Sequence, residues 1–211
     1  MMIRLLSGAA FVALAACTAP DTPAEGPGAA AAPDAETAAA VPALEQVWIA
    51  EGFEDPEGIA LAPDGNYLVS NVKGEGSEKD GDGYVSKISP DGELIEKYFA
   101  AKLNGPKGMA VKDGVLYVAD TGEVVTFDAA TGLDRNAIKV PGAGFLNDMT
   151  VWGDKVLVSD SGTGEIIDVS SGEPVVWMKD ERFGGINGLL GDGDRLLVAT
   201  MATGSLFSVT A

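Results

Sequence analysis

Short β-rich runs recur along the chain from about residue 44, and glycine or Asp-Gly pairs separate them. Four similar segments follow one another at spacings of 50, 40 and 40 residues: 56–60, 106–110, 146–150 and 186–190. Each is followed by a second run, at 67–71, 116–120, 156–160 and 196–200. A third run opens at Gly83, Gly122, Gly164 and Gly204, and a fourth lies at 93–99, 137–140 and 173–178. Such runs, joined by turn residues, predict antiparallel strands.

Four short strands in about 40 residues are typical of one blade of a β-propeller. We therefore expect an all-β chain, a β-propeller of four four-stranded blades of about 42 residues each. The expected blades cover residues 44–90, 91–130, 131–171 and 172–211, and the additional residues of the first form a long loop at 72–82. Residues 44–50 match a fourth strand, so they could pair with the last blade and close the ring.

The N-terminus has the features of a processing signal. Arg4 precedes an apolar run that ends at residue 16, which is shorter than the ~20 residues of a membrane span. The sequence Leu-Ala-Ala-Cys at 14–17 resembles the lipobox of bacterial lipoproteins, which implies cleavage before Cys17 and lipidation of that residue. A threonine rather than an aspartate after the cysteine resembles the pattern of lipoproteins that are sorted to the outer membrane, where the protein would face the periplasm. The alternative is an ordinary secretory peptide with a chance cysteine.

Residues 17–43 are predicted to be a linker. The stretch after Cys17 is rich in alanine and proline and lacks aromatic residues, lysine and arginine, so it has too little apolar bulk to fold. We therefore expect a signal peptide at 1–16, a lipidated tether at 17–43 and a folded domain at 44–211.

Charge and composition exclude several classes of function. The net charge of −18 argues against a nucleic-acid partner, because binding phosphates needs an excess of lysine and arginine. The chain has no histidine, which removes imidazole bases and histidine-ligated metal sites. A single cysteine cannot form an internal disulfide. Any chemistry must come from carboxylates, amides, hydroxyls or lysine.

The repeat motifs resemble the SMP-30/gluconolactonase/LRE-like propellers, and segments 105–110 and 116–122 also resemble NHL repeats. The resemblance covers residues 46–211 and implies a propeller. Propellers of that family usually have six blades. The chain is therefore a four-bladed ring, a propeller that lacks two blades, or an open arc closed by another chain; the order of its repeats favours the second.

The same resemblance implies a divalent metal on the central axis, most naturally Ca²⁺, and activity on sugar lactones. Carried over by position, Glu57, Asn147 and Asn187 are the expected metal ligands, and Lys107 takes an axial substrate-binding position. Asp148 and Asp160 are the candidate bases, and Asp120 is a further candidate for substrate binding.

The chemistry of these residues leaves alternatives open. Hard cations accept carboxylate and amide oxygens, but one carboxylate with two amides is a weak complement for a 2+ charge. Lys107 would repel a cation and could instead pair with Glu57. Asp120 and Asp160 stand at strand ends, where they could simply hydrogen-bond a turn. The sequence therefore predicts either a metal-dependent, lactonase-like hydrolase or a non-catalytic envelope propeller that binds a small ligand or a protein partner.

Overall fold

Fifteen β-strands make up almost all the regular structure of residues 45–210, which are the residues described by the computed structural model. The predicted signal peptide, lipidation site and linker (residues 1–43) lie outside the described residues. Within residues 45–210, no helix is long and apolar enough to cross a membrane.

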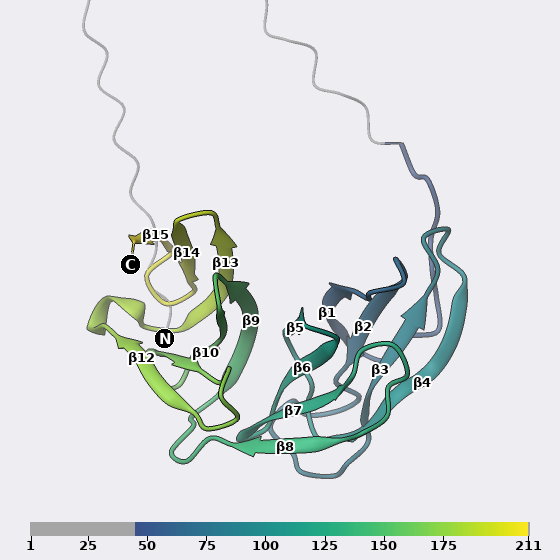
Figure 1. Ribbon diagram of the computed structural model, residues 1–211, viewed down its shortest axis with the longest axis horizontal. Helices are drawn as coiled ribbons and strands as arrows, with labels where there is room; N and C mark the ends of the chain where they lie inside the picture. The colour runs from purple at the N-terminus through teal and green to yellow at the C-terminus, as the bar shows by residue number, and fades with distance from the viewer. Residues whose placement is uncertain (1–44, 211) are drawn as a thin grey trace, which may run out of the picture. The chain divides into compact units, whose positions relative to one another are not determined.

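The strands form four antiparallel sheets in chain order (Figure 1). The first sheet contains β1 (Pro56–Leu61), β2 (Tyr67–Asn71), β3 (Gly83–Ile88) and β4 (Leu94–Leu103). The second contains β5 (Met109–Lys112), β6 (Val115–Asp120), β7 (Glu123–Asp128) and β8 (Asn136–Lys139). The third contains β9 (Leu146–Trp152), β10 (Lys155–Asp160), β11 (Glu165–Asp168) and β12 (Val175–Lys179). The fourth contains β13 (Ile186–Asp192), β14 (Arg195–Thr200) and β15 (Ser205–Thr210), after a short 3₁₀ helix at Glu181–Phe183.

Each sheet is a meander in which consecutive strands pair, so the predicted all-β class and its repeated sheets are confirmed. The predicted turns also form. At Asp113-Gly114 both residues have positive φ angles, 50° and 80°, as a two-residue hairpin turn of this kind requires. The sheets run over 56–103, 109–139, 146–179 and 186–210, whereas the expected blade boundaries lay before each fourth strand.

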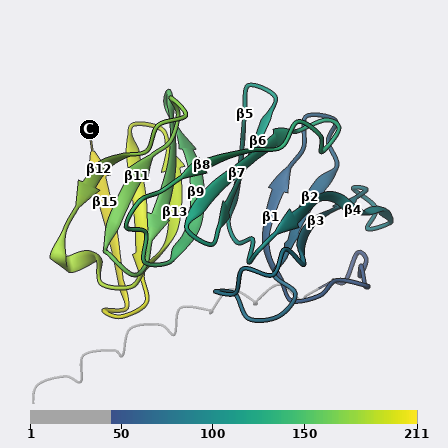
Figure 2. The same cartoon turned by 90° about the horizontal axis from the view of Figure 1, so that it is seen from below.

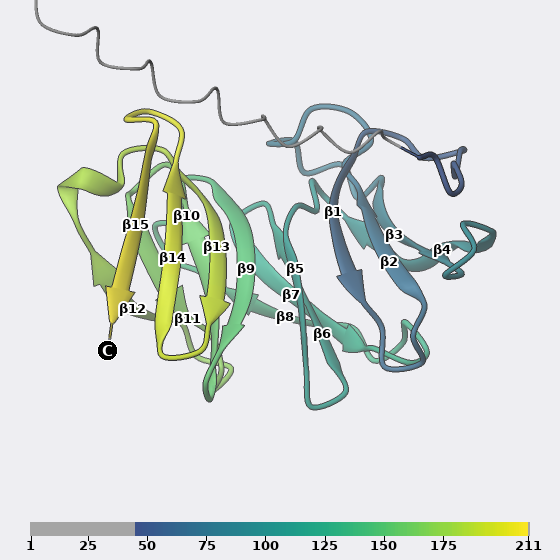
Figure 3. The same cartoon turned by 90° about the horizontal axis from the view of Figure 1, so that it is seen from above.

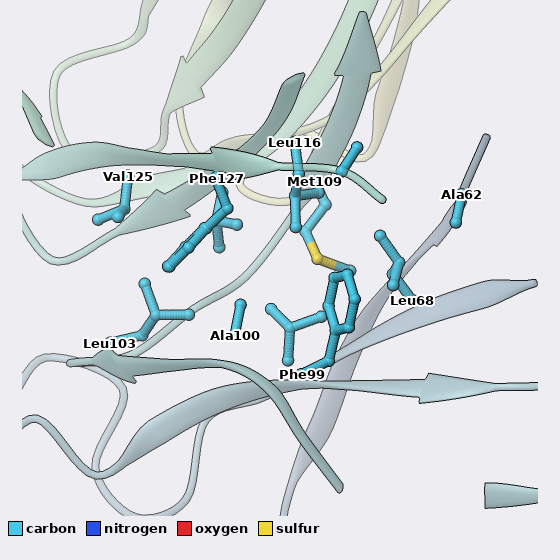
Figure 4. Packing of buried hydrophobic residues seen from close by; sticks show 12 residues of the cluster. Ala62, Leu68, Phe99, Ala100, Leu103, Met109, Leu116, Val125 and Phe127 are labelled. Atoms are coloured by element: carbon cyan, nitrogen blue, oxygen red, sulfur yellow. The ribbon is translucent and has the colours of Figure 1, made fainter. Parts of the chain in front are cut away.

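The sheets pack face to face in sequence, and their first strands lie next to one another. β1 contacts β5, β5 contacts β9, and β9 contacts β13 (Figures 1 and 3). A separate apolar cluster fills each of the three interfaces between sheets. Figure 4 shows the first, where Phe99 and Leu103 of sheet one lie opposite Met109 and Phe127 of sheet two. This radial stacking buries both faces of the two middle sheets (Figure 2).

The predicted ring closure by residues 44–50 is wrong for the part of this segment that the structure describes. Residues 45–55 form no strand, and Trp48 packs beside sheet one, 6.5 Å from the ring of Tyr67. Glu54, which follows in this segment, accepts a hydrogen bond from the Tyr84 hydroxyl at 2.8 Å and pairs with Lys97 at 3.1 Å. These contacts hold the segment on the first sheet, and the described fourth sheet has three strands.

Candidate functional site

The first strands of all four sheets border one cavity of about 410 Å³. The repeat motif places a polar residue at or just before the start of each of these strands, and three of the four line the cavity: Glu57, Asn147 and Asn187. Asp148 joins them. The prediction that the motif positions meet at the centre of the sheets thus holds for these residues.

Close packing of the first strands explains the glycine that follows the polar residue in the first two repeats. A Cβ atom on Gly108 would lie 2.5 Å from the Cα of Asp148, and one on Gly58 would lie 2.7 Å from the carbonyl oxygen of Lys107. The third repeat has Asp148 where the other three have glycine. This repeat alone therefore places a side chain at that position.

Asp148 is half-buried and connects two sheets. Its Oδ1 accepts a hydrogen bond from the N–H of Met149 at 2.8 Å, and its Oδ2 accepts one from the N–H of Leu189 at 2.7 Å. Burial raises the pKa of the Asp148 carboxyl above its ordinary value, although these two hydrogen bonds act in the opposite direction. The carboxyl is therefore a stronger base than a solvated aspartate.

Glu57 borders the same cavity and is more exposed than Asp148. Desolvation raises its pKa most, the negative charge of Asp148 raises it further, and Lys107 lowers it. Two carboxyl groups therefore share one cavity, and a bound cation would favour the charged form of both.

The two amides differ in their surroundings. Asn147 is buried, and its Nδ2 donates to Ser161 Oγ at 3.2 Å. Asn187 is half-buried, and its Nδ2 lies 3.2 Å from the sulfur of Met201. Together with the two carboxylates they supply a set of oxygen donors to the cavity.

Lys107 does not line this cavity. Its ammonium donates to the carbonyl oxygens of Gly76 and Gly105 at 2.7 and 2.8 Å, and it lies 4.5 Å from the centroid of the Phe145 ring. Burial lowers the pKa of Lys107, and the charges of Asp120 and Glu57 partly offset this. Lys107 therefore fastens the long loop at 72–82 to the second sheet, and the side chain that was expected to bind substrate already has these partners.

Asp120 and Asp160 are fully buried and bind backbone N–H groups of the loop that enters their own sheet. Asp120 accepts hydrogen bonds from Asn104 and Gly105, at 2.7–3.0 Å for the backbone donors. Asp160 accepts them from Gly144 and Phe145 at 2.8 Å, and also from two residues that follow it. Neither side chain borders the cavity, and both serve these backbone donors, so the roles of Asp160 as a base and of Asp120 as a substrate ligand stay predictions.

Sequence analysis missed Ser159, which positions two residues of the cavity at once. Its Oγ accepts a hydrogen bond from the N–H of Asp148 at 2.9 Å and donates one to the carbonyl oxygen of Asn187 at 2.8 Å. Ser70 accepts the N–H of Gly58 in the first sheet in the same way, at 2.8 Å. The signal is present in the repeats, where serine alternates with alanine at positions 70, 119, 159 and 199.

Within residues 45–210, no group of three or more acidic, histidine or cysteine side chains is arranged to hold a metal. Any cation in the cavity would therefore depend on amide oxygens as well as on Glu57 and Asp148. These ligand types suit a hard divalent ion such as Ca²⁺ rather than a transition metal that prefers nitrogen or sulfur.

Comparisons with known proteins define the class of fold. A family model described as outer membrane protein assembly factor BamB matches residues 81–167, which is less than half of the chain. A search of curated proteins found no match.

Solved structures with low sequence identity share the fold. Virginiamycin B lyase from Staphylococcus aureus has a TM-score of 0.57 and 16% identity, over 74% of this chain and 52% of the lyase. The PQQ-bound aldose sugar dehydrogenase from Streptomyces coelicolor has a TM-score of 0.52 and 14% identity, over 69% of this chain and 56% of the dehydrogenase. The computationally designed Ika4 protein has a TM-score of 0.54 and 12% identity, over 79% and 99% of the two chains.

The described domain is thus a β-propeller in architecture, and it spans about half the length of the lyase and of the dehydrogenase. At these identities the likeness shows the fold alone. The resemblance to the SMP-30 family stays a prediction.

Proposed function

We propose that the cavity at the first strands is the active site of a small-molecule hydrolase that acts on a sugar lactone or a similar small ester with a bound divalent cation. The observation that carries the proposal is that Glu57, Asn147, Asp148 and Asn187, from three sheets, border one cavity of about 410 Å³. That volume suits a small ligand. The propeller neighbours include a lyase and a sugar dehydrogenase, so the architecture is compatible with an enzyme.

The donor chemistry fits a hard cation, with Glu57, Asn147 and Asn187 as its side-chain ligands. Asp148 also borders the cavity. Its carboxylate would add a second negative charge near a 2+ ion, whereas the three ligands alone supply only one. When bound, such an ion polarises an ester carbonyl and acidifies a bound water. Calcium is the ion that this set of oxygen donors favours.

Asp148 is suited to accept a proton from water during ester hydrolysis. The hydrogen bonds from Met149 and Leu189 fix its carboxylate, so little reorganisation is needed when a substrate binds. Its raised pKa brings it closer to neutrality, where a general base is most effective. Ser159 holds the backbone of Asp148 in place.

The test measures calcium binding and lactone hydrolysis on the same samples. We expect one calcium ion per chain by titration calorimetry and hydrolysis that a chelator abolishes. Glu57→Gln should weaken calcium binding at least tenfold, and Asp148→Asn should lower kcat at least 100-fold. Glu93→Gln, which removes an exposed carboxylate at a turn, is the matched control and should change neither. Unchanged hydrolysis in both cavity variants would refute the assignment.

A non-catalytic binding module is the second candidate. It is favoured by the absence of a three-acid cluster in the described residues and by the match to a family described as an assembly factor. In that case the same cavity or a propeller face would bind a small ligand or a protein partner of the cell envelope. Chelator-independent thermal stabilisation by sugars or lactones, without turnover, would favour this candidate.

We also propose that the chain is a lipoprotein, anchored to the outer membrane through Cys17 and facing the periplasm. The support is the lipobox-like segment at 14–17 and the match of residues 81–167 to a family described as outer membrane protein assembly factor BamB. Cys17→Ser should abolish the labelling of the protein by a fatty-acid probe, because it removes the thiol that would be acylated. Labelling that persists in this variant would contradict the anchor.

A further inference from the structure

The first sheet exposes apolar residues at positions that the other sheets bury. Ile59 is 63% exposed, whereas the residues at the same place in the repeat, Met109, Met149 and Leu189, are 5–7% exposed. These three lie against the preceding sheet. Leu61, on the same side of β1 as Ile59, is 61% exposed. The first sheet thus has an uncovered face of the kind that receives a preceding sheet.

The last sheet shows the opposite relationship. Leu206 in β15 is 71% exposed, whereas the equivalent residues Val85, Val124 and Ile166 are fully buried against the following sheet. Leu190 is 58% exposed, and with Leu197 and Leu206 it borders an apolar groove of about 210 Å³. The last sheet thus has an uncovered face of the kind that receives a following sheet.

These two faces are the two halves of the interface that the protein already uses three times. In each interior interface, leucine, valine or isoleucine from one sheet packs against methionine, leucine or valine from the next. The leucines of the last sheet and Ile59 and Leu61 of the first have the same chemistry. Large apolar side chains exposed in one patch disfavour an isolated molecule in water.

The segment before β1 adds to the first face. Trp48 lies against Tyr67, and its neighbours Val47 and Ile49 are 85% and 69% exposed. In the described residues, β15 is paired on one side only, by β14. A molecule that docks its first sheet on the last sheet of another would bring this apolar segment towards the open edge of β15.

We propose that a second copy of this chain covers both faces, with the last sheet of each copy packed on the first sheet of the other. The argument for a second copy is that one chain carries both halves of the interface. A twofold pair would bury both faces on both chains at once and leave neither half exposed. The contact would repeat the stacking of sheets one to four across the two junctions.

The oligomeric state tests this directly. The full chain is purified with Cys17→Ser, so that neither acyl chains nor an intermolecular disulfide contributes, and is studied by sedimentation velocity at micromolar concentration. We expect a single species of twice the mass of the purified chain. Leu61→Glu and Leu206→Glu should each raise the dimer Kd at least tenfold, because each buries a charge in both junctions. Leu133→Glu, at a residue 65% exposed in the turn between β7 and β8, is the control and should leave the Kd unchanged.

Mixing the two variants tests which faces meet. A Leu61→Glu chain and a Leu206→Glu chain together retain one junction free of substitutions, so the mixture should dimerise more strongly than either variant alone. Circular dichroism of each variant establishes that the sheets are retained. A monomer for the unsubstituted chain, an open-ended series of oligomers, or a dimer that neither substitution weakens would overturn the proposal. A monomer would instead point to a different protein as the cover of both faces.

Discussion

Asp148 Oδ2 accepts the backbone N–H of Leu189 at 2.7 Å, and this hydrogen bond ties the first strand of sheet three to the first strand of sheet four. The residue occupies a position at which the other repeats have glycine. A single aspartate therefore links two sheets and also places a carboxylate in the cavity between them. Structure and candidate chemistry are coupled at this residue, so tests of the site need controls for stability.

The glycines beside Asp148 provide such a test of the packing. Gly108→Ala should lower the free energy of unfolding by about 2–3 kcal/mol, because the new Cβ would overlap the backbone of Asp148. Gly188→Ala is the matched control, since its Cβ would meet Ala199 and Asp148 at 3.5 and 4.0 Å, which are ordinary contacts. Urea unfolding measures both. Equal effects of the two substitutions would contradict the described approach of β5 to β9.

Glu57→Gln should raise the thermal midpoint at pH 7.5 in the presence of a chelator. Desolvation and Asp148 raise the pKa of Glu57, so its charged form destabilises the folded state at pH values above the folded-state pKa. As the pH falls below the ordinary pKa of glutamate, Glu57 becomes protonated in both the folded and the unfolded state, and its destabilising effect disappears. The gain in midpoint should therefore vanish near pH 3.5. A gain that persists there would have another cause.

Asp160→Asn should destabilise the protein by about 2 kcal/mol, because an amide cannot accept all the backbone N–H groups that the buried carboxylate satisfies. Asp113→Asn, at an exposed turn residue, should change the free energy of unfolding by less than about 0.5 kcal/mol. Denaturant unfolding gives both values. Full stability of the Asp160 variant would indicate that the carboxylate is not structural.

Lys107→Met should release the loop at 72–82. Methionine replaces the apolar stem of the lysine but cannot donate the hydrogen bonds to the carbonyl oxygens of Gly76 and Gly105. Limited proteolysis with an enzyme that cuts after glutamate, at Glu75 or Glu78, should become several-fold faster. The exposed Lys102→Met is the control. Identical cleavage rates in the two variants would count against the fastening role of Lys107.

The repeats made the sheets and the central position of Glu57, Asn147 and Asn187 predictable, because equivalent residues of stacked sheets converge. The location of residues 45–50 was not predictable, since strand-like composition does not specify which sheet a segment contacts. Lys107 illustrates a second limit: its long side chain reaches carbonyl oxygens of a loop whose path the repeats do not encode. Asp160 and Asp148 both accept backbone N–H groups, but only Asp148 also borders the cavity, and the sequence does not show this difference.

The fastening of each entry loop to its own sheet has a consequence for how such proteins diversify. Asn71 accepts the N–H of Glu54, Asp120 accepts that of Gly105, and Asp160 accepts that of Phe145, always within one sheet. Each of the first three sheets therefore carries the side chain that holds its own entry loop. A gene segment that encodes one such sheet with its entry loop can be duplicated or deleted without removing the hydrogen bonds that hold the next entry loop. This suits an architecture whose number of blades varies during evolution.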